Sequence, residues 1–154
     1  MMNISKIFLV SLISSLAILS SVYNLYAEEG NINGTTYVNG GIGQEEADEM
    51  RTKAGSYNLR LYMSEGKHGH SITDAQVTVF DKKGNVKLDL SNGGPMLFLH
   101  VVNGGYKIIA KYNGSTITRD VNISNRRGEN LYLIWKSADT DEYKDTEDEH
   151  SQDH

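Results

Sequence analysis

The sequence predicts a mostly β protein: a sandwich of seven short strands preceded by one short helix. Between residues 57 and 135, apolar and polar residues alternate with the period of half-buried strands. Turn signals rich in Gly and Asn recur there at intervals of about eight to twelve residues. No helical pattern separates the strands, which excludes a parallel α/β sheet. A β-meander and a β-barrel are the alternatives to the sandwich.

The first 27 residues have the pattern of a secretory signal peptide. Lys6 is the one charged residue before Glu28, and residues 7–19 are apolar apart from serines. This run is shorter than the roughly 20 residues that a membrane-spanning helix needs. We therefore expect cleavage after Ala27, a periplasmic or secreted location, and no stable membrane anchor after cleavage. An uncleaved anchor is the alternative, because Leu25 is large for its place in a cleavage site.

Charge divides the remaining chain into a nearly neutral body and an acidic end. Residues 138–154 hold eight acidic residues and one lysine, which predicts a disordered tail. No basic stripe is present, so nucleic acid is not an expected partner. The chain contains no cysteine, which excludes disulfides and thiolate metal sites. The expected organisation is a signal peptide (1–27), a Gly-rich lead-in with a short helix (28–56), a β-sandwich domain (57–137) and the tail (138–154).

One helix is expected, over Gln44–Ala54. Acidic residues come first in it and basic residues last, as the helix dipole favours. Ala47, Met50 and Ala54 form a narrow apolar stripe. Residues 28–36, rich in Gly and Asn, are expected to be flexible.

The strands follow the helix. Their predicted ranges are Tyr57–Met63, Ala75–Phe80, Val86–Leu90, Met96–Val101, Tyr106–Tyr112, Ser115–Ile123 and Asn130–Trp135. Asn113-Gly114 is a strong hairpin signal between two of them. Leu61, Val79, Ile108 and Leu133 each lie on the apolar face of a different strand and are expected to share one core.

Several short motifs resemble those of the carboxypeptidase regulatory-like domain. They are Val77–Phe80, Lys83-Gly84, Asn92-Gly93-Gly94 before Met96-Leu97-Phe98, and Gly105-Tyr106. A bacterial exported subgroup is more similar still, with the glycine-rich segment Tyr37–Gly43 and the strand beginning Tyr57-Asn58-Leu59. Asn103 stands where the family usually has a proline, and Asn can hold that turn.

The resemblance implies a transthyretin-like (prealbumin-like) Greek-key sandwich and a non-catalytic accessory module. The implied role is binding, without a cofactor, to an unknown protein or glycan partner in the cell envelope. Transthyretin-related hydroxyisourate hydrolases end in a Tyr-Arg-Gly-Ser motif, whereas this domain ends in the segment Leu133–Ser137. His100, between Leu99 and Val101, is expected to be a surface residue. We therefore expect no enzymatic activity.

Metal handling is the alternative function. His68 and His70 form a His-x-His pair in a loop, and imidazoles bind Cu, Ni or Zn. A specific site needs three or four ligands, and Asp74 is the one acidic residue just downstream. His150 and His154 lie in the acidic tail and could add weak cation binding.

A possible interaction surface lies on the outward faces of the strands. Tyr62, Phe80, Phe98 and Tyr132 occupy positions where a solvated strand would be polar. The helix is expected to cover some of these side chains. Any that are left uncovered would form an apolar patch of the kind that commonly marks an interaction site.

Overall fold

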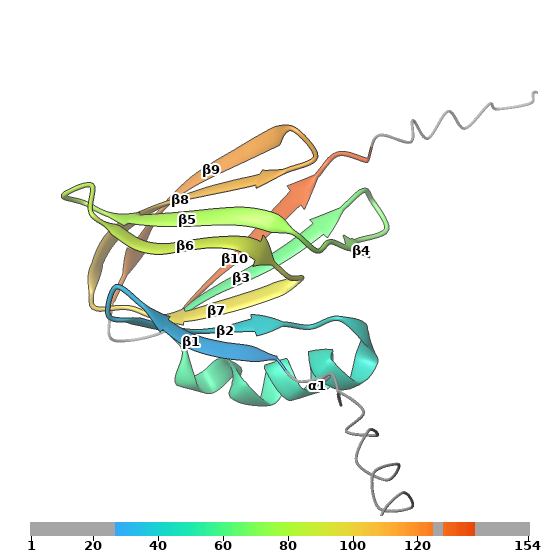
Figure 1. Cartoon of the computed structure of the whole chain (residues 1–154), viewed down its shortest axis with the longest axis horizontal. Helices are drawn as coiled ribbons and strands as arrows, with labels where there is room; N and C mark the ends of the chain where they lie inside the picture. The colour runs from blue at the N-terminus through green and yellow to red at the C-terminus, as the bar shows by residue number, and fades with distance from the viewer. Residues whose placement is uncertain (1–26, 125–127, 138–154) are drawn as a thin grey trace, which may run out of the picture.

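Two β-sheets pack face to face in the computed structural model, which describes residues 27–124 and 128–137 (Figure 1). The elements are β1 (Glu28–Ile32), β2 (Thr35–Gly40), α1 (Gly43–Lys53), a 3-10 turn η2 (Ala54–Ser56), β3 (Leu59–Glu65), β4 (His70–Ser71), β5 (Ala75–Asp81), β6 (Val86–Gly93), β7 (Met96–His100), β8 (Gly104–Tyr112), β9 (Ser115–Ile123) and β10 (Glu129–Trp135). All seven predicted strands and the predicted helix are present, with shifts of one to three residues at most of their ends.

The chain passes from the first sheet to the second and back twice. The first sheet has the order β1-β2-β7-β3-β10, with β4 paired to β3. The second has the order β6-β5-β8-β9. Every pair is antiparallel except β3 with β10, which run parallel with Tyr62 opposite Tyr132. The molecule is therefore mostly β, with two sheets and one short helix.

The segment expected to be a flexible lead-in is instead a β-hairpin. Glu28–Ile32 pairs with Thr35–Gly40 around Asn33 and Gly34, whose φ angles are 50° and 78°. Two positive φ values are the requirement of a type I′ turn, and Asn-Gly is its preferred sequence. The same turn joins β8 to β9 at Asn113 (φ 47°) and Gly114 (φ 74°), where the sequence predicts it.

The main core lies between the two sheets. Leu61, Val79, Ile108 and Leu133 are fully buried in it, which confirms the prediction of a shared core. Trp135 closes this core near the end of β10, with its ring 5.7 Å from that of Tyr112 and edge-on to it. The alternating faces of the strands were therefore assigned correctly from their sequence pattern.

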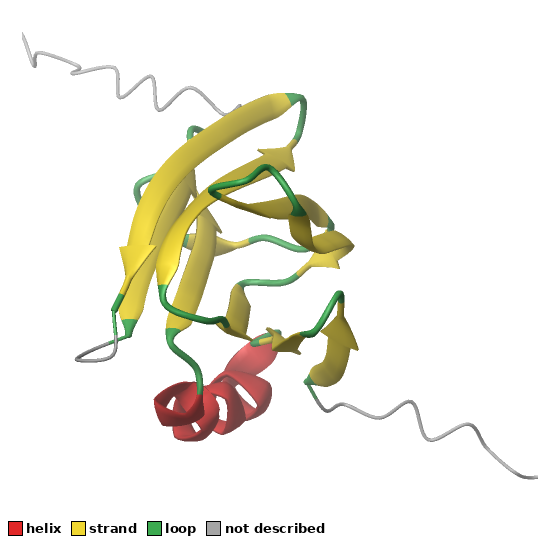
Figure 2. Ribbon diagram, turned by 90° about the vertical axis from the view of Figure 1, so that its left-hand side faces the viewer, coloured by secondary structure: helices red, strands yellow, loops and turns green. Residues whose placement is uncertain are grey.

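A second, smaller core lies between α1 and the outer face of the first sheet. Met50 from the helix packs there on Val38 and Phe98, and all three are fully buried. Figures 1 and 2 show the helix beneath β1 and β2, on the side away from β5 and β6. Gly41, with φ 93°, turns the chain from β2 into the helix, where a Cβ would press on Met96.

Candidate functional site

The four aromatic residues expected on outward faces do not form one surface. Tyr62, Phe98 and Tyr132 lie on the outer face of the first sheet, because they come from β3, β7 and β10. Phe80 lies on β5, in the second sheet. The outer faces of the two sheets point to opposite sides of the molecule, so Phe80 belongs to a separate site.

An aromatic row crosses the outer face of the first sheet; we define it as Tyr57, Phe98, Tyr62 and Tyr132. The ring of Tyr62 meets that of Phe98 edge-on at 5.4 Å and stacks on that of Tyr132 at 5.1 Å. Such pairs each contribute about 0.5–1.5 kcal/mol beyond the area they bury. Burial raises the pKa of the Tyr62 hydroxyl, so this ring is neutral over the physiological range. The row therefore runs from beneath the helix to the open edge of the sheet.

The helix covers only part of this row, as the sequence predicts. Phe98 is fully buried and Tyr62 is half-buried, while Tyr132 is 63% exposed. Ile134, two residues further along β10, is 59% exposed. The side chains that α1 does not reach form an apolar patch at the β10 edge.

A groove occupies the outer face of the second sheet, beside the turn between β5 and β6. Its volume is about 910 Å³. Phe80 and Ile109, both half-buried, form its apolar floor. The residues with polar groups at its rim are Lys82, Lys107, Asp120 and Asn122. Phe80 pairs with Lys107 in the sheet and Lys107 with Asp120, so three neighbouring strands contribute side chains to one surface.

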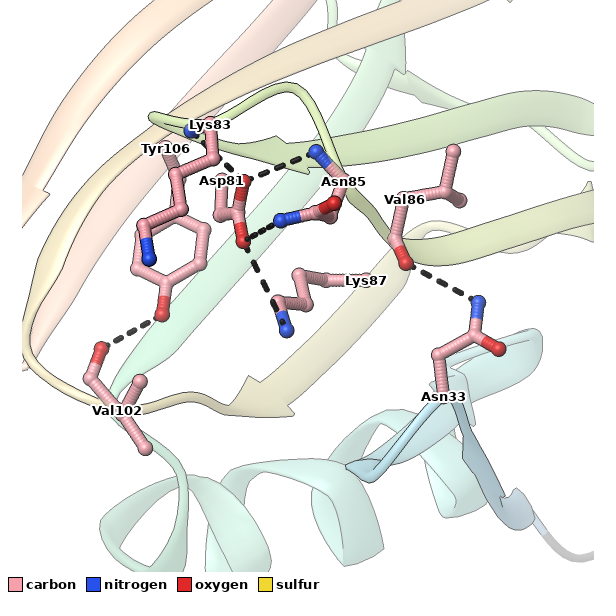
Figure 3. Close-up of polar contacts among 8 residues, drawn as sticks. All are labelled: Asn33, Asp81, Lys83, Asn85, Val86, Lys87, Val102 and Tyr106. Carbon is pink, nitrogen blue, oxygen red and sulfur yellow. Dashed lines mark hydrogen bonds and ion pairs between the residues drawn. The ribbon is translucent and has the colours of Figure 1, made fainter.

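The turn that walls this groove is held by one carboxylate (Figure 3). Asp81 Oδ1 accepts hydrogen bonds from the backbone N–H groups of Lys83 (2.8 Å) and Asn85 (2.9 Å). Its Oδ2 accepts one from the Asn85 side-chain amide (2.9 Å), and Lys87 Nζ lies 3.8 Å away. The Asn85 amide and then the backbone donors lower the pKa of Asp81 below its ordinary value. The turn is therefore fixed in place over the sheet.

Two further contacts set the shape around the groove. The Tyr106 hydroxyl donates to the carbonyl of Val102 (2.7 Å), which ties the start of β8 to the loop before it (Figure 3). Gly105 leaves its space to Lys82, because a Cβ there would press on the Lys82 side chain and displace it. The Lys82 side chain consequently lies against the backbone of β8 at one end of the groove.

The structure does not build a metal centre around the predicted histidines. His68 and His70 come from the loop and short strand after β3, and both are exposed. Their ring centroids are 6.2 Å apart. In residues 27–124 and 128–137, no group of three or more His, Cys, Asp or Glu side chains is close enough to hold a metal ion. His150 and His154 lie outside the described residues.

The remaining predictions fall partly inside and partly outside the described residues. His100 is exposed on β7, opposite Thr36, as expected of a surface residue. The predicted signal peptide up to residue 26 and the acidic segment 138–154 lie outside the described residues. Within the described part of the chain, no helix is long and apolar enough to cross a membrane.

We compared the chain with known proteins and found no relative. No protein-family model matches this chain. A search of curated proteins finds no significant match either. The resemblance to the carboxypeptidase regulatory-like domain therefore stays a prediction.

Of the residues that line the groove, Phe80 alone is predicted from the sequence to belong to an interaction surface. Ile109 is on the outward face of β8, between Lys107 and Lys111. An apolar residue between two lysines on this face could have indicated a binding surface. Asp120 and Asn122 follow the ordinary pattern of a solvated strand. Only the pairing of β5, β8 and β9 brings these residues together.

Proposed function

We propose that this chain is an exported, non-catalytic binding module whose ligand is a short glycan of the cell envelope. The observation that carries the proposal is the groove over β5, β8 and β9, with its apolar floor and polar rim. Its volume of about 910 Å³ falls within the range of known ligand sites, roughly 300–1,000 Å³.

The chemistry of the groove suits a sugar. A pyranose has an apolar face of C–H groups, which packs on aromatic rings, and a rim of hydroxyls that donate and accept hydrogen bonds. Phe80 supplies an apolar surface for the C–H face of the sugar, with Ile109 beside it. Asp120 can accept hydrogen bonds, Lys107 can donate them and Asn122 can do both. The rim can therefore pair with sugar hydroxyls that act as donors or as acceptors.

We propose the carboxypeptidase regulatory-like family and a transthyretin-like Greek key for the domain. This is supported by the order of the seven long strands after the helix, β7-β3-β10 in one sheet and β6-β5-β8-β9 in the other. The parallel pairing of the first and last of these strands, β3 and β10, is further support. Export is supported by the start of β1 at Glu28, the residue expected to begin the mature chain.

Binding measurements on groove variants test this function. The exported protein is titrated by calorimetry with a panel of soluble oligosaccharides, and then the variants Phe80→Ala and Asp120→Ala are titrated with the best ligand. We expect each variant to bind at least about tenfold more weakly, a loss of about 1.4 kcal/mol. Val102→Ala is the matched control, because Val102 is 76% exposed and outside the groove.

Four results would count against the proposal. The glycan function is wrong if no oligosaccharide binds, or if the groove variants bind as well as the control. Binding of a protein from the cell envelope at the same groove would replace the glycan with a protein ligand. Turnover of an ester or purine-derived substrate would contradict the non-catalytic role.

The metal-handling alternative rests on the pair His68 and His70 and on the acidic tail that contains His150 and His154. Within residues 27–124 and 128–137, the two exposed imidazoles have no further ligand close enough to complete a specific site. Calorimetric titration with Ni²⁺ or Zn²⁺ separates the two functions, because His68→Ala would abolish tight metal binding and leave oligosaccharide binding unchanged.

A further inference from the structure

The β10 strand has one side that no described strand pairs with. At its start, the Glu129 N–H donates to the carbonyl of Asn58 (2.9 Å), and at its end the Trp135 carbonyl accepts from Gly66 N–H (2.8 Å). Both bonds point toward β3. Because the direction of backbone groups alternates along a strand, Asn130, Tyr132 and Ile134 turn their N–H and C=O groups away from β3. These are also the residues whose side chains lie on the exposed outer face.

The β10 edge has less protection than the other sheet edges, and β9 approaches it at its end, where the Trp135 indole N–H donates to the Ser115 carbonyl (3.3 Å). Natural proteins block strand edges with charged side chains, prolines or covering segments. The charged residues on the other described edges are Glu28 and Glu29 on β1, Lys87 and Asp89 on β6, and Arg119 and Asp120 on β9. The β6 edge is also covered, since the Asn33 side-chain amide donates to the Val86 carbonyl (3.1 Å; Figure 3). On β10 the one charged residue is Glu129, at its first position, and residues 130–135 contain neither a charge nor a proline.

The same edge carries the uncovered end of the aromatic row. Tyr132 and Ile134 are both more than half exposed, although large apolar side chains stabilise a protein most when buried. Tyr132 is already held by its stack on Tyr62, so its position is defined before any partner arrives. An ordered apolar surface beside unpaired backbone groups is what a β-strand partner requires.

We propose that a second copy of this chain pairs with the first through β10, antiparallel and centred on Tyr132. The two copies are then related by a twofold axis and form one continuous sheet. Tyr132 lies opposite Tyr132 of the partner subunit, and Asn130 lies opposite Ile134 of the partner subunit. All of these residues have outward-facing backbone groups, so about six inter-chain hydrogen bonds form.

Charge favours a second copy over other occupants of the edge. With no charged residue in 130–135, two identical strands meet without like charges facing each other. In the antiparallel arrangement the two Trp135 residues, the last of each β10, lie at opposite ends of the paired strands, and the acidic segment 138–154 follows each of them in the sequence. The Cα atoms of these two residues are then about 20 Å apart, more than twice the screening length of about 8 Å at physiological salt. The inference does not depend on the proposed glycan site, which lies on the other sheet.

Sedimentation of the protein expressed from its full-length sequence tests the association. We expect a reversible dimer whose population rises with concentration and falls at least tenfold in Ile134→Lys. Val102→Lys is the control: it adds the same charge at an exposed apolar residue away from β10 and should leave the dimer intact. A monomer at all concentrations would overturn the proposal, whether the edge is free, occupied by another partner or covered by the chain itself.

Engineered disulfides test the register, because the chain has no cysteine of its own. Opposite Cα atoms in a hydrogen-bonded pair are about 5.5 Å apart, within disulfide range. Tyr132→Cys should therefore cross-link to the same position of the partner subunit under mild oxidation. Ile134→Cys places a cysteine at a similarly exposed position, but the Cα atoms of the two copies would be about 14 Å apart there. This variant should therefore not cross-link. Equal cross-linking of both variants, or none of Tyr132→Cys, would contradict the proposed pairing.

Discussion

At the scale of single residues, the structure is held by side chains that bond to backbone groups. Asp81 closes the turn beside the groove. The side chain of Asn39 bridges two strands in a similar way: its amide donates to the Asn92 carbonyl (3.0 Å) and its oxygen accepts from Gly94 N–H (2.8 Å). The sequence predicts turns at both places, since Asp, Asn and Gly are concentrated there. It does not show which side chain on a distant strand satisfies the backbone of a turn.

Replacing Asp81 with Asn should weaken the turn in a manner that depends on pH. The carboxylate is stabilised by its hydrogen bonds, which lower its pKa in the folded state. This contribution is present above the unfolded-state pKa of about 3.9 and is lost as the pH falls through the lower, folded-state pKa. We expect Asp81→Asn to have a lower melting temperature than the parent at pH 7, and the gap to narrow in strong acid.

Thermal melts between pH 2 and pH 7 measure this gap. Asp89→Asn is the matched control, because the Asp89 carboxylate accepts a single side-chain hydrogen bond, from the Thr78 hydroxyl (3.2 Å). Its melting temperature should stay close to that of the parent at all pH values. A gap for Asp81→Asn that is independent of pH would show that the carboxylate charge has no role in the turn.

At the scale of elements, the strands with apolar alternation were predictable and the first hairpin was not. Residues 28–32 are Glu-Glu-Gly-Asn-Ile, a sequence poor in strand-forming residues. The strand exists because β2 provides a partner and Asn33-Gly34 provides the turn. Asn-Gly occurs both here and before β9. Apolar and polar residues do not alternate around Asn33, so the sequence does not indicate a hairpin at this place. Pairing with β2, rather than the strand preference of its own residues, therefore makes this segment a strand.

The helix should be anchored by one side chain. Met50 is fully buried against Val38 and Phe98, so Met50→Ala removes apolar contacts and leaves a cavity. We expect a loss of about 2–5 kcal/mol in the free energy of unfolding, measured by urea denaturation. Ile42→Ala, at the 56% exposed residue before the helix, should cost less than about 0.5 kcal/mol. Equal losses for the two variants would mean that the helix does not pack on the sheet through this face.

At the scale of the whole molecule, the class of fold was predictable but the position of the groove was not. Periodicity gives each strand and its buried face, which is why Leu61 and Leu133 were assigned correctly to the core. It does not give the order in which strands pair. The prediction that Phe80 and Tyr62 share a surface was therefore wrong about the sheets, although both side chains point outward as predicted. Phe80 comes from the second sheet and Tyr62 from the first.

The mature protein should begin at Glu28. The charged start, the apolar run and the polar boundary motivate cleavage after Ala27. The side chain of Glu28 also accepts a hydrogen bond from the Tyr37 hydroxyl (3.1 Å), so a chain that starts there keeps its first strand attached. Intact-mass measurement of the protein from its native host checks this. A mass that includes residues 1–27 would contradict both the cleavage and the proposed export.

The central claim is that the groove over β5, β8 and β9 binds a glycan, and chemical-shift mapping tests it most directly. Backbone NMR spectra of the exported protein are recorded while the oligosaccharide that binds best is added. The account predicts that the largest shift changes fall at Phe80, Lys107, Ile109 and Asp120, with little change at Tyr132 and Ile134. Changes centred on the aromatic row or the His68–His70 loop would contradict it, as would a spectrum that no oligosaccharide alters.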